Sequence, residues 1–152
     1  MSFIVYCAIV AGIFFTEYNI KKHVETSYDK GVKREYLKGR VRIEKHHNSG
    51  FAGSVAHKRS GVVAAASLAV TIIGIILFLA SMGRHGNGFV RLGLSLVLGG
   101  AFSNTYERLK KRYVVDYLSF NTKVKFFSRL VFNVSDFCII LGALLTVLGI
   151  LR

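Results

Sequence analysis

The sequence contains no proline and no tryptophan, two cysteines, and only eight acidic residues among its 152 residues. Two cysteines cannot build a disulfide framework, and the chain shows no repeat or low-complexity segment of the kind found in fibrous or disordered proteins. By contrast, 52% of the residues are hydrophobic, and 21 lysines and arginines give a net charge of +13. Because the hydrophobic residues form long runs instead of amphipathic elements, this charge does not indicate a nucleic-acid binder. The composition predicts an integral membrane protein.

The long apolar runs predict four transmembrane helices, since about 20 mostly apolar residues are needed to cross a bilayer. The predicted helices cover residues 2–20, 62–82, 88–108 and 130–151. Two large connections, 21–61 and 109–129, remain between them, and the alternating residues 40–44 indicate a short strand in the first. We therefore expect an all-α integral membrane fold, a single membrane domain over 1–152, with a small β-containing first loop.

The positive charges are concentrated in the two large connections, which an even number of helices places on the same side of the membrane. The first connection holds eleven lysines and arginines, and the last, counted from Glu107 to Arg129, holds seven, whereas the turn between the second and third helices holds only Arg84. Because cytoplasmic loops are usually the ones rich in lysine and arginine, this count predicts that both large connections are cytoplasmic.

Two of the few acids lie in apolar surroundings, where a carboxylate is costly and therefore suggests a function. Asp136 lies inside the last predicted helix, and Asp116 follows the third one among valines and tyrosines. We expect helices three and four to bring them to the same face of the membrane. Two carboxylates that share such a site hold one proton between them, as in aspartic proteases. The alternative is that each aspartate pairs separately with a lysine or arginine and only fixes a helix end.

Polar and small residues occur near these acids at helical spacing. Asn133 precedes Asp136 by three residues, so that both side chains can face the interior from one helix face. Asn104 and Arg108 are four residues apart and also share a face of their helix. The small residues 99–101 would allow another helix to approach closely. These positions favour a polar site built inside the helix bundle.

Five blocks of the sequence, which lie in order along nearly the whole chain, carry a resemblance to a known family. They are residues 17–21, 48–52, 99–108, 113–117 and 132–136. Their residue types and spacing resemble the signature blocks of signal peptidase II, the lipoprotein signal peptidase, which is a four-helix membrane aspartyl endopeptidase. The second block also offers an amide and a flexible glycine that could lie along an extended peptide.

The resemblance implies a role for each matching residue. Asp116 and Asp136 are similar to the catalytic dyad of the family, which requires neither a metal nor an organic cofactor. The residues that match positions binding the substrate or supporting the site are Glu17, Lys21, Asn48, Gly50, Asn104, Arg108 and Asn133. The implied substrate is a prolipoprotein that carries diacylglyceryl on a cysteine and is cut just before that cysteine. Membrane phospholipids are the other expected partners, with no nucleic acid, and the protein is expected to be a monomer.

The resemblance also implies a location: a multi-pass protein of the bacterial cytoplasmic (inner) membrane, with its active site toward the extracytoplasmic face. That orientation is the opposite of the one predicted by the lysine and arginine count. We follow the resemblance, because charge counts weigh less in a folded loop and a basic surface can also bind anionic lipid headgroups.

Four positions depart from the family pattern and mark a divergent member, namely Glu17, Ser103, Glu107 and Ser135. An added methylene in an acidic side chain can move a carboxylate by about 1 Å and loosen a positioned network. A second hypothesis is therefore a non-catalytic paralogue that binds lipopeptide or anionic lipid. A small transporter that uses the two acids as a proton relay is a third, although no internal repeat supports it.

Overall fold

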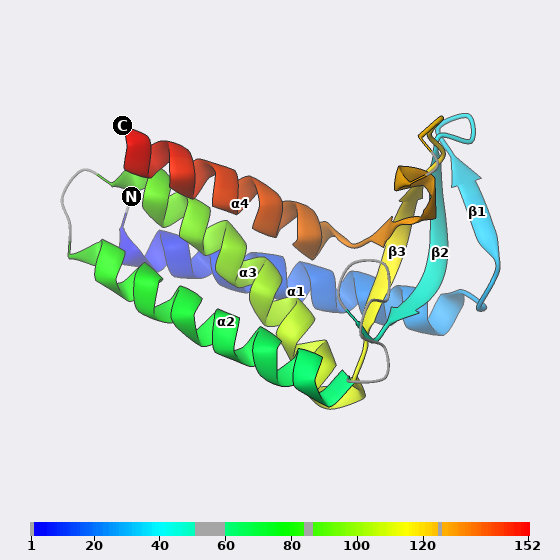
Figure 1. Cartoon of the computed structure of the whole chain (residues 1–152), viewed down its shortest axis with the longest axis horizontal. Helices are drawn as coiled ribbons and strands as arrows, with labels where there is room; N and C mark the ends of the chain where they lie inside the picture. The colour runs from blue at the N-terminus through cyan, green and yellow to red at the C-terminus, as the bar shows by residue number, and fades with distance from the viewer. Residues whose placement is uncertain (1, 51–59, 84–86, 125) are drawn as a thin grey trace.

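The structure, a computed structural model, describes residues 2–50, 60–83, 87–124 and 126–152. Within these ranges four α-helices lie side by side, with a β-sheet at one end of the bundle and both termini at the other (Figure 1). The helices are α1 (Phe3–Ser27), α2 (Ser60–Met82), α3 (Gly88–Lys111) and α4 (Val134–Leu151), and a short 3-10 helix, η3 (Phe127–Arg129), precedes α4. The fold is therefore mostly helical.

The sheet corrects the all-α prediction. It is antiparallel, in the order β1 (Lys33–Tyr36), β2 (Val41–Asn48), β3 (Val114–Phe120) and β4 (Val131–Phe132). A strand in the first large connection was expected, but the last connection contributes two more strands, and β2 pairs with β3. The reason lies in residues 113–120, whose valines and aromatic residues favour a strand over a continued helix.

Two helix boundaries also differ from the predictions. α1 continues to Ser27 instead of ending at residue 20, because Val24 at its far end packs against β3 residues Val115 and Tyr117. α4 begins at Val134 instead of residue 130, because the two residues of β4 pair with β3 just before it. The first helix therefore reaches beyond the bundle and supports the sheet.

Helix α3 occupies the centre of the bundle and contacts each of the other three helices. Small residues allow this, as predicted: a side chain at Gly99 would collide with Ile13 of α1, and one at Gly100 would collide with the Ser135 carbonyl of α4. Among the described helices, α1, α2 and α4 are long and apolar enough to cross a membrane. α3 is not among them because many of its buried residues are polar.

Candidate active site

Asp116, which was predicted to follow the third helix, lies on strand β3. Its side chain is only 2% exposed. Two amides hold its carboxylate: Asn48 Nδ2 donates to Oδ2 at 2.9 Å, and Asn133 Nδ2 donates to Oδ1 at 2.7 Å. Asn48 is the last residue of β2, so that the pairing of β2 with β3 positions this amide beside Asp116. The sheet therefore places the first carboxylate.

Asp136 lies in the first turn of α4, where Asn133 is the N-cap. The Asn133 side chain accepts a hydrogen bond from the Asp136 backbone N–H at 3.1 Å, and the Asn133 N–H donates to Asp136 Oδ2 at 3.0 Å. Asn104 Nδ2 of α3 donates to the other oxygen at 3.0 Å. Asn133 was expected on the same helix face as Asp136, but as the cap it can bond to both aspartates. One asparagine therefore links the two carboxylates.

The charges around the pair favour a shared proton. In the described part of the chain, the ion pairs involve other acids and neither of these two aspartates. Burial raises the pKa of Asp116 to about 7, and the negative charge of Asp136 adds to the effect. The described residues therefore do not form the two separate pairs with lysine or arginine of the alternative hypothesis, although Asp136 does cap a helix.

The two aspartates line one pocket of about 250 Å³. Its polar lining residues are Asn48, Asn104, Arg108, Asp116, Asn133 and Asp136, and apolar residues from 130–132 and α4 form the remaining wall. Arg108 Nη2 donates to the Gly50 carbonyl at 3.4 Å, whereas its buried Nε has no hydrogen-bond partner among the described residues. Such a pocket, with polar groups on one side and apolar groups on the other, can accommodate an extended peptide segment.

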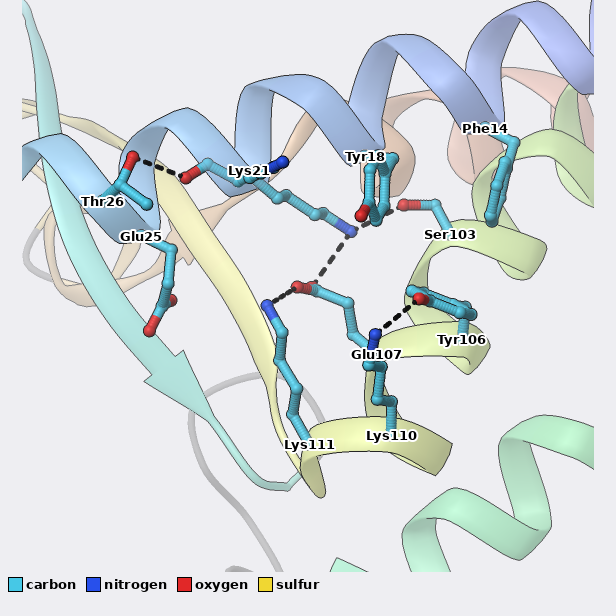
Figure 2. Close-up of a pocket in the computed structure, with 11 residues that line it drawn as sticks. Phe14, Tyr18, Lys21, Glu25, Thr26, Ser103, Tyr106, Glu107, Lys110 and Lys111 are labelled. Atoms are coloured by element: carbon cyan, nitrogen blue, oxygen red, sulfur yellow. Dashed lines mark hydrogen bonds and ion pairs between the residues drawn. The ribbon is translucent and has the colours of Figure 1, made fainter.

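The remaining predicted residues, Glu17 and Lys21, come from α1 and do not line this pocket. Figure 2 shows the Lys21 side chain extending from α1 toward Ser103 and Glu107 of α3. Lys21 Nζ donates to Ser103 Oγ at 2.9 Å and to Asn104 Oδ1 at 2.7 Å. It also lies 3.5 Å from Glu17 and 3.6 Å from Glu107. Asn104 therefore links Lys21 to Asp136 by hydrogen bonds.

Sequence reasoning missed the role of Tyr117. The residue is 4% exposed, its hydroxyl donates to Glu17 Oε1 at 2.5 Å, and burial raises its pKa, which keeps it a donor. Ser135 Oγ donates to the other Glu17 oxygen at 2.9 Å. No local pattern in the sequence indicated this contact, because its partners are 100 positions apart.

Comparison with known proteins agrees with this architecture. The family model described as signal peptidase (SPase) II matches residues 7–152. The lipoprotein signal peptidase of Brucella ovis is 39% identical over 103 residues, which are 67% of this chain and 62% of that protein. The one from Mesorhizobium japonicum is 34% identical over 101 residues, which are 66% of this chain and 58% of that protein. The matches thus span about three fifths of the length of these relatives.

Solved structures show the same fold. A bacterial membrane enzyme determined by the in meso method at 2.3 Å resolution superposes with a TM-score of 0.83 over 98% of this chain and 88% of that one, at 22% identity. A second one, at 1.9 Å, gives a TM-score of 0.80 at 22% identity, over 99% and 94% of the two chains. With its apolar helices, this chain is a multi-pass membrane protein, and it belongs to the signal peptidase II family, peptidase family A8.

Proposed function

We propose that this protein is a membrane aspartic endopeptidase that removes the signal peptide from diacylglyceryl-modified prolipoproteins by cutting before the lipidated cysteine. The observation that carries the proposal is the pair of carboxylates, Asp116 and Asp136, joined by the amide of Asn133 in a single pocket. The substrate class comes from the relatives, which are named lipoprotein signal peptidase. The chemistry needs only this chain and water.

In the proposed reaction the pair carries one proton. The ionised carboxylate removes a proton from a water molecule, whose oxygen attacks the scissile carbonyl carbon while the protonated carboxyl donates its proton to the carbonyl oxygen. When the tetrahedral intermediate collapses, the C–N bond breaks and a proton passes to the leaving nitrogen. The raised pKa of Asp116 supports the shared proton, which belongs to the pair and not to one named member.

Neighbouring side chains would position the two carboxylates and the peptide. Asn48 and Asn133 each donate an N–H to Asp116, which leaves the carboxylate little freedom to rotate. Asn104 does the same for Asp136. The Nε–H of Arg108, which has no partner among the described residues, would donate to a peptide carbonyl, and the bond from Arg108 to the Gly50 carbonyl keeps Gly50 beside the pocket. All these residues come from one chain, which is consistent with a monomer and a single membrane domain.

We propose that the carboxylate pocket faces the extracytoplasmic side of the bacterial inner membrane. Part of the positive charge in the first connection is neutralised within the folded sheet, where Lys33 pairs with Glu44 at 3.1 Å and Arg42 pairs with Glu35 at 3.1 Å. A membrane-impermeant thiol reagent would test the orientation in a variant that lacks both native cysteines. Leu37→Cys, in the exposed β1–β2 turn, should react from outside, and Gly83→Cys, at the opposite end of the bundle, should not. The reverse pattern would exclude this orientation.

A gel-shift cleavage assay tests the activity. A diacylglyceryl-modified prolipoprotein is incubated in detergent with the wild type, Asp116→Asn, Asp136→Asn or the matched control Asp29→Asn, whose aspartate is exposed in the first connection. We expect cleavage by the wild type and by the control, and loss of at least 10³-fold with either pocket variant, as for removal of a catalytic group.

Other outcomes would decide between the hypotheses. If the folded wild type does not cut a substrate that another member of the family cuts, the peptidase proposal fails. Binding of the lipopeptide that survives both asparagine substitutions would then favour the non-catalytic paralogue. Proton flux in vesicles that depends on both aspartates would favour the transporter.

A further inference from the structure

A second cavity of the molecule is an apolar groove between α1, α2 and α3. It has a volume of about 480 Å³, and its lining includes Phe3, Cys7, Ala11 and Phe14 of α1, and Leu98 and Phe102 of α3. In the part of the chain that the structure describes, it shares no lining residue with the carboxylate pocket. Because α1 and α2, which form two of its walls, are long and apolar enough to cross a membrane, we expect the groove to be open to lipid and not to water.

The groove continues into a polar pocket of about 150 Å³ at the end of the bundle near the sheet. Phe14 lines both cavities, and the next turn of each helix adds a tyrosine, Tyr18 on α1 and Tyr106 on α3 (Figure 2). One turn further, Lys22 and Lys110 line the same pocket. The two helices run in the same direction, so that both change together from apolar to aromatic to basic (Figure 1). This order matches the change from lipid chain to headgroup across one leaflet.

The charges of the polar pocket are only partly balanced. Lys21 lies between Glu17 and Glu107, and Lys111 Nζ is 2.8 Å from Glu107. The other acid of the lining, Glu25, pairs with His47 at 3.0 Å, outside the pocket. The cations at the rim of the pocket take no part in these contacts.

The rim carries two exposed lysines, Lys22 and Lys110, and neither has a carboxylate partner among the described residues. Lys110 Nζ donates to the Tyr106 hydroxyl at 3.1 Å, which holds this ammonium group beside the pocket. The rim is therefore complementary to an anion.

The dimensions agree with one leaflet of a bilayer. Half of the hydrocarbon core is about 15 Å, or about ten residues of helix. Ala11 lies eleven residues before Lys22 on α1, and Leu98 lies twelve residues before Lys110 on α3. This part of the groove thus covers about one leaflet, which is the reach of one acyl chain, and the groove continues beyond it as far as Phe3.

We infer that these two cavities form a binding site for an acidic glycerophospholipid, separate from the carboxylate pocket. One acyl chain lies in the groove past Phe14, and the phosphate lies between the ammonium groups of Lys22 and Lys110. An extended peptide would leave its backbone N–H and C=O groups unpaired in the apolar groove. The headgroup of a zwitterionic lipid carries a cation as well as a phosphate, and the lysines of the rim would repel this cation. The charge of the rim therefore selects an anionic headgroup.

Native mass spectrometry of the full chain in detergent tests the site, with equimolar phosphatidylglycerol and phosphatidylcholine of identical acyl chains. Lys22→Gln/Lys110→Gln is compared with Lys30→Gln/Lys123→Gln, which removes the same charge from exposed lysines elsewhere. One lysine at a lipid surface changes the affinity for an anionic headgroup by about fivefold. We therefore expect the first double variant to lower the preference for phosphatidylglycerol by about 25-fold, and the control to leave it unchanged.

A second pair of variants tests the groove. Ala11→Trp fills it, whereas Ala143→Trp places the same side chain on the exposed surface of α4. Ala11→Trp should reduce the binding of both lipids, and Ala143→Trp should not. Thermal unfolding in the same detergent confirms that each variant is folded.

Three results would overturn the inference. They are equal binding of the two lipids by the wild type, an equal loss in both lysine double variants, and displacement of phosphatidylglycerol by a diacylglyceryl prolipopeptide. The last result would assign the cavity to the lipid of the substrate. Because binding is measured without cleavage, failure here leaves the proposed peptidase activity standing.

Discussion

Two polar clusters meet at Asn104 of helix α3, and their carboxylates have different partners. On the side of α4, Asp116 and Asp136 accept hydrogen bonds from neutral amides. On the side of α1, Glu17 and Glu107 lie beside the ammonium group of Lys21, at 3.5 and 3.6 Å. Both clusters are shielded from water by the same helix.

The difference in partners determines what each cluster can do. A carboxylate that is held by amides can gain or lose a proton without breaking an ion pair, so the Asp116–Asp136 pair is suited to proton transfer. A carboxylate that is held by an ammonium group keeps that contact only while it stays ionised. The Lys21 cluster is therefore suited to joining α1 to α3, and four predictions test this division.

The largest expected effect comes from removing the buried cation with Lys21→Met. This change leaves Glu17 and Glu107 without their shared partner, and breaking a buried pair in this way costs about 3–5 kcal/mol. The free energy of unfolding in mixed micelles measures it. The exposed Lys123→Met is the control and should change stability by less than about 0.5 kcal/mol. Adding Glu17→Gln to Lys21→Met should restore part of the loss, and no restoration would contradict the proposed charge balance.

The second expected effect is on the pH dependence of stability, which arises from the Asp116–Asp136 pair. The pKa of Asp116 is raised from 3.8 to about 7, so the folded protein binds more protons than the unfolded chain between these values. This contribution to stability is fully present below about pH 4 and is lost as the pH rises through about 7, on the order of 2–4 kcal/mol in all. Asp116→Asn should remove this part of the pH dependence. Parallel stability curves for the wild type and the variant would contradict the raised pKa.

The third prediction separates the two tasks of Asn133. Serine is a good N-cap residue but is too short to reach Asp116, so Asn133→Ser should keep α4 stable to within about 1 kcal/mol. Losing the amide that bridges the carboxylates should lower kcat/KM by about 10²-fold, as for loss of one positioned donor. Asn133→Ala loses both the cap and the bridge and should be less stable than the serine variant by about 1 kcal/mol. Retention of activity by Asn133→Ser would show that the bridge is dispensable.

The smallest expected effect tests the close packing of α3 against α4. A methyl group at Gly100 would lie 2.5 Å from the Ser135 carbonyl oxygen, so Gly100→Ala should push α4 away from α3 and cost about 1–3 kcal/mol. At Gly12 no heavy atom lies within 4 Å, so Gly12→Ala should be neutral or stabilise α1 by up to about 1 kcal/mol. A lowered Tm for the first variant alone would confirm the difference.

The sequence predicted contacts at short range better than contacts between distant segments. Helical spacing places Asn104 and Arg108 on one face of α3, and both line the carboxylate pocket. The bond from Tyr117 to Glu17 joins residues 100 positions apart, and no periodicity of either segment indicates it. The strand that carries Asp116 was missed for a related reason, because β3 is defined by its pairing with β2 from another connection.

The pairing of β2 with β3 has a consequence for how the protein is made. Asn48 and its partner Asp116 are separated by 68 positions, so that the β1–β2 ribbon leaves the ribosome long before its neighbour in the sheet. A two-stranded ribbon is only marginally stable in water. The ribbon therefore lacks its neighbouring strand while α2 and α3 enter the membrane, and it is stabilised only after β3 has been synthesised. Asp136 arrives last, with α4, so that a nascent chain cannot assemble the pocket before nearly all of it has been synthesised.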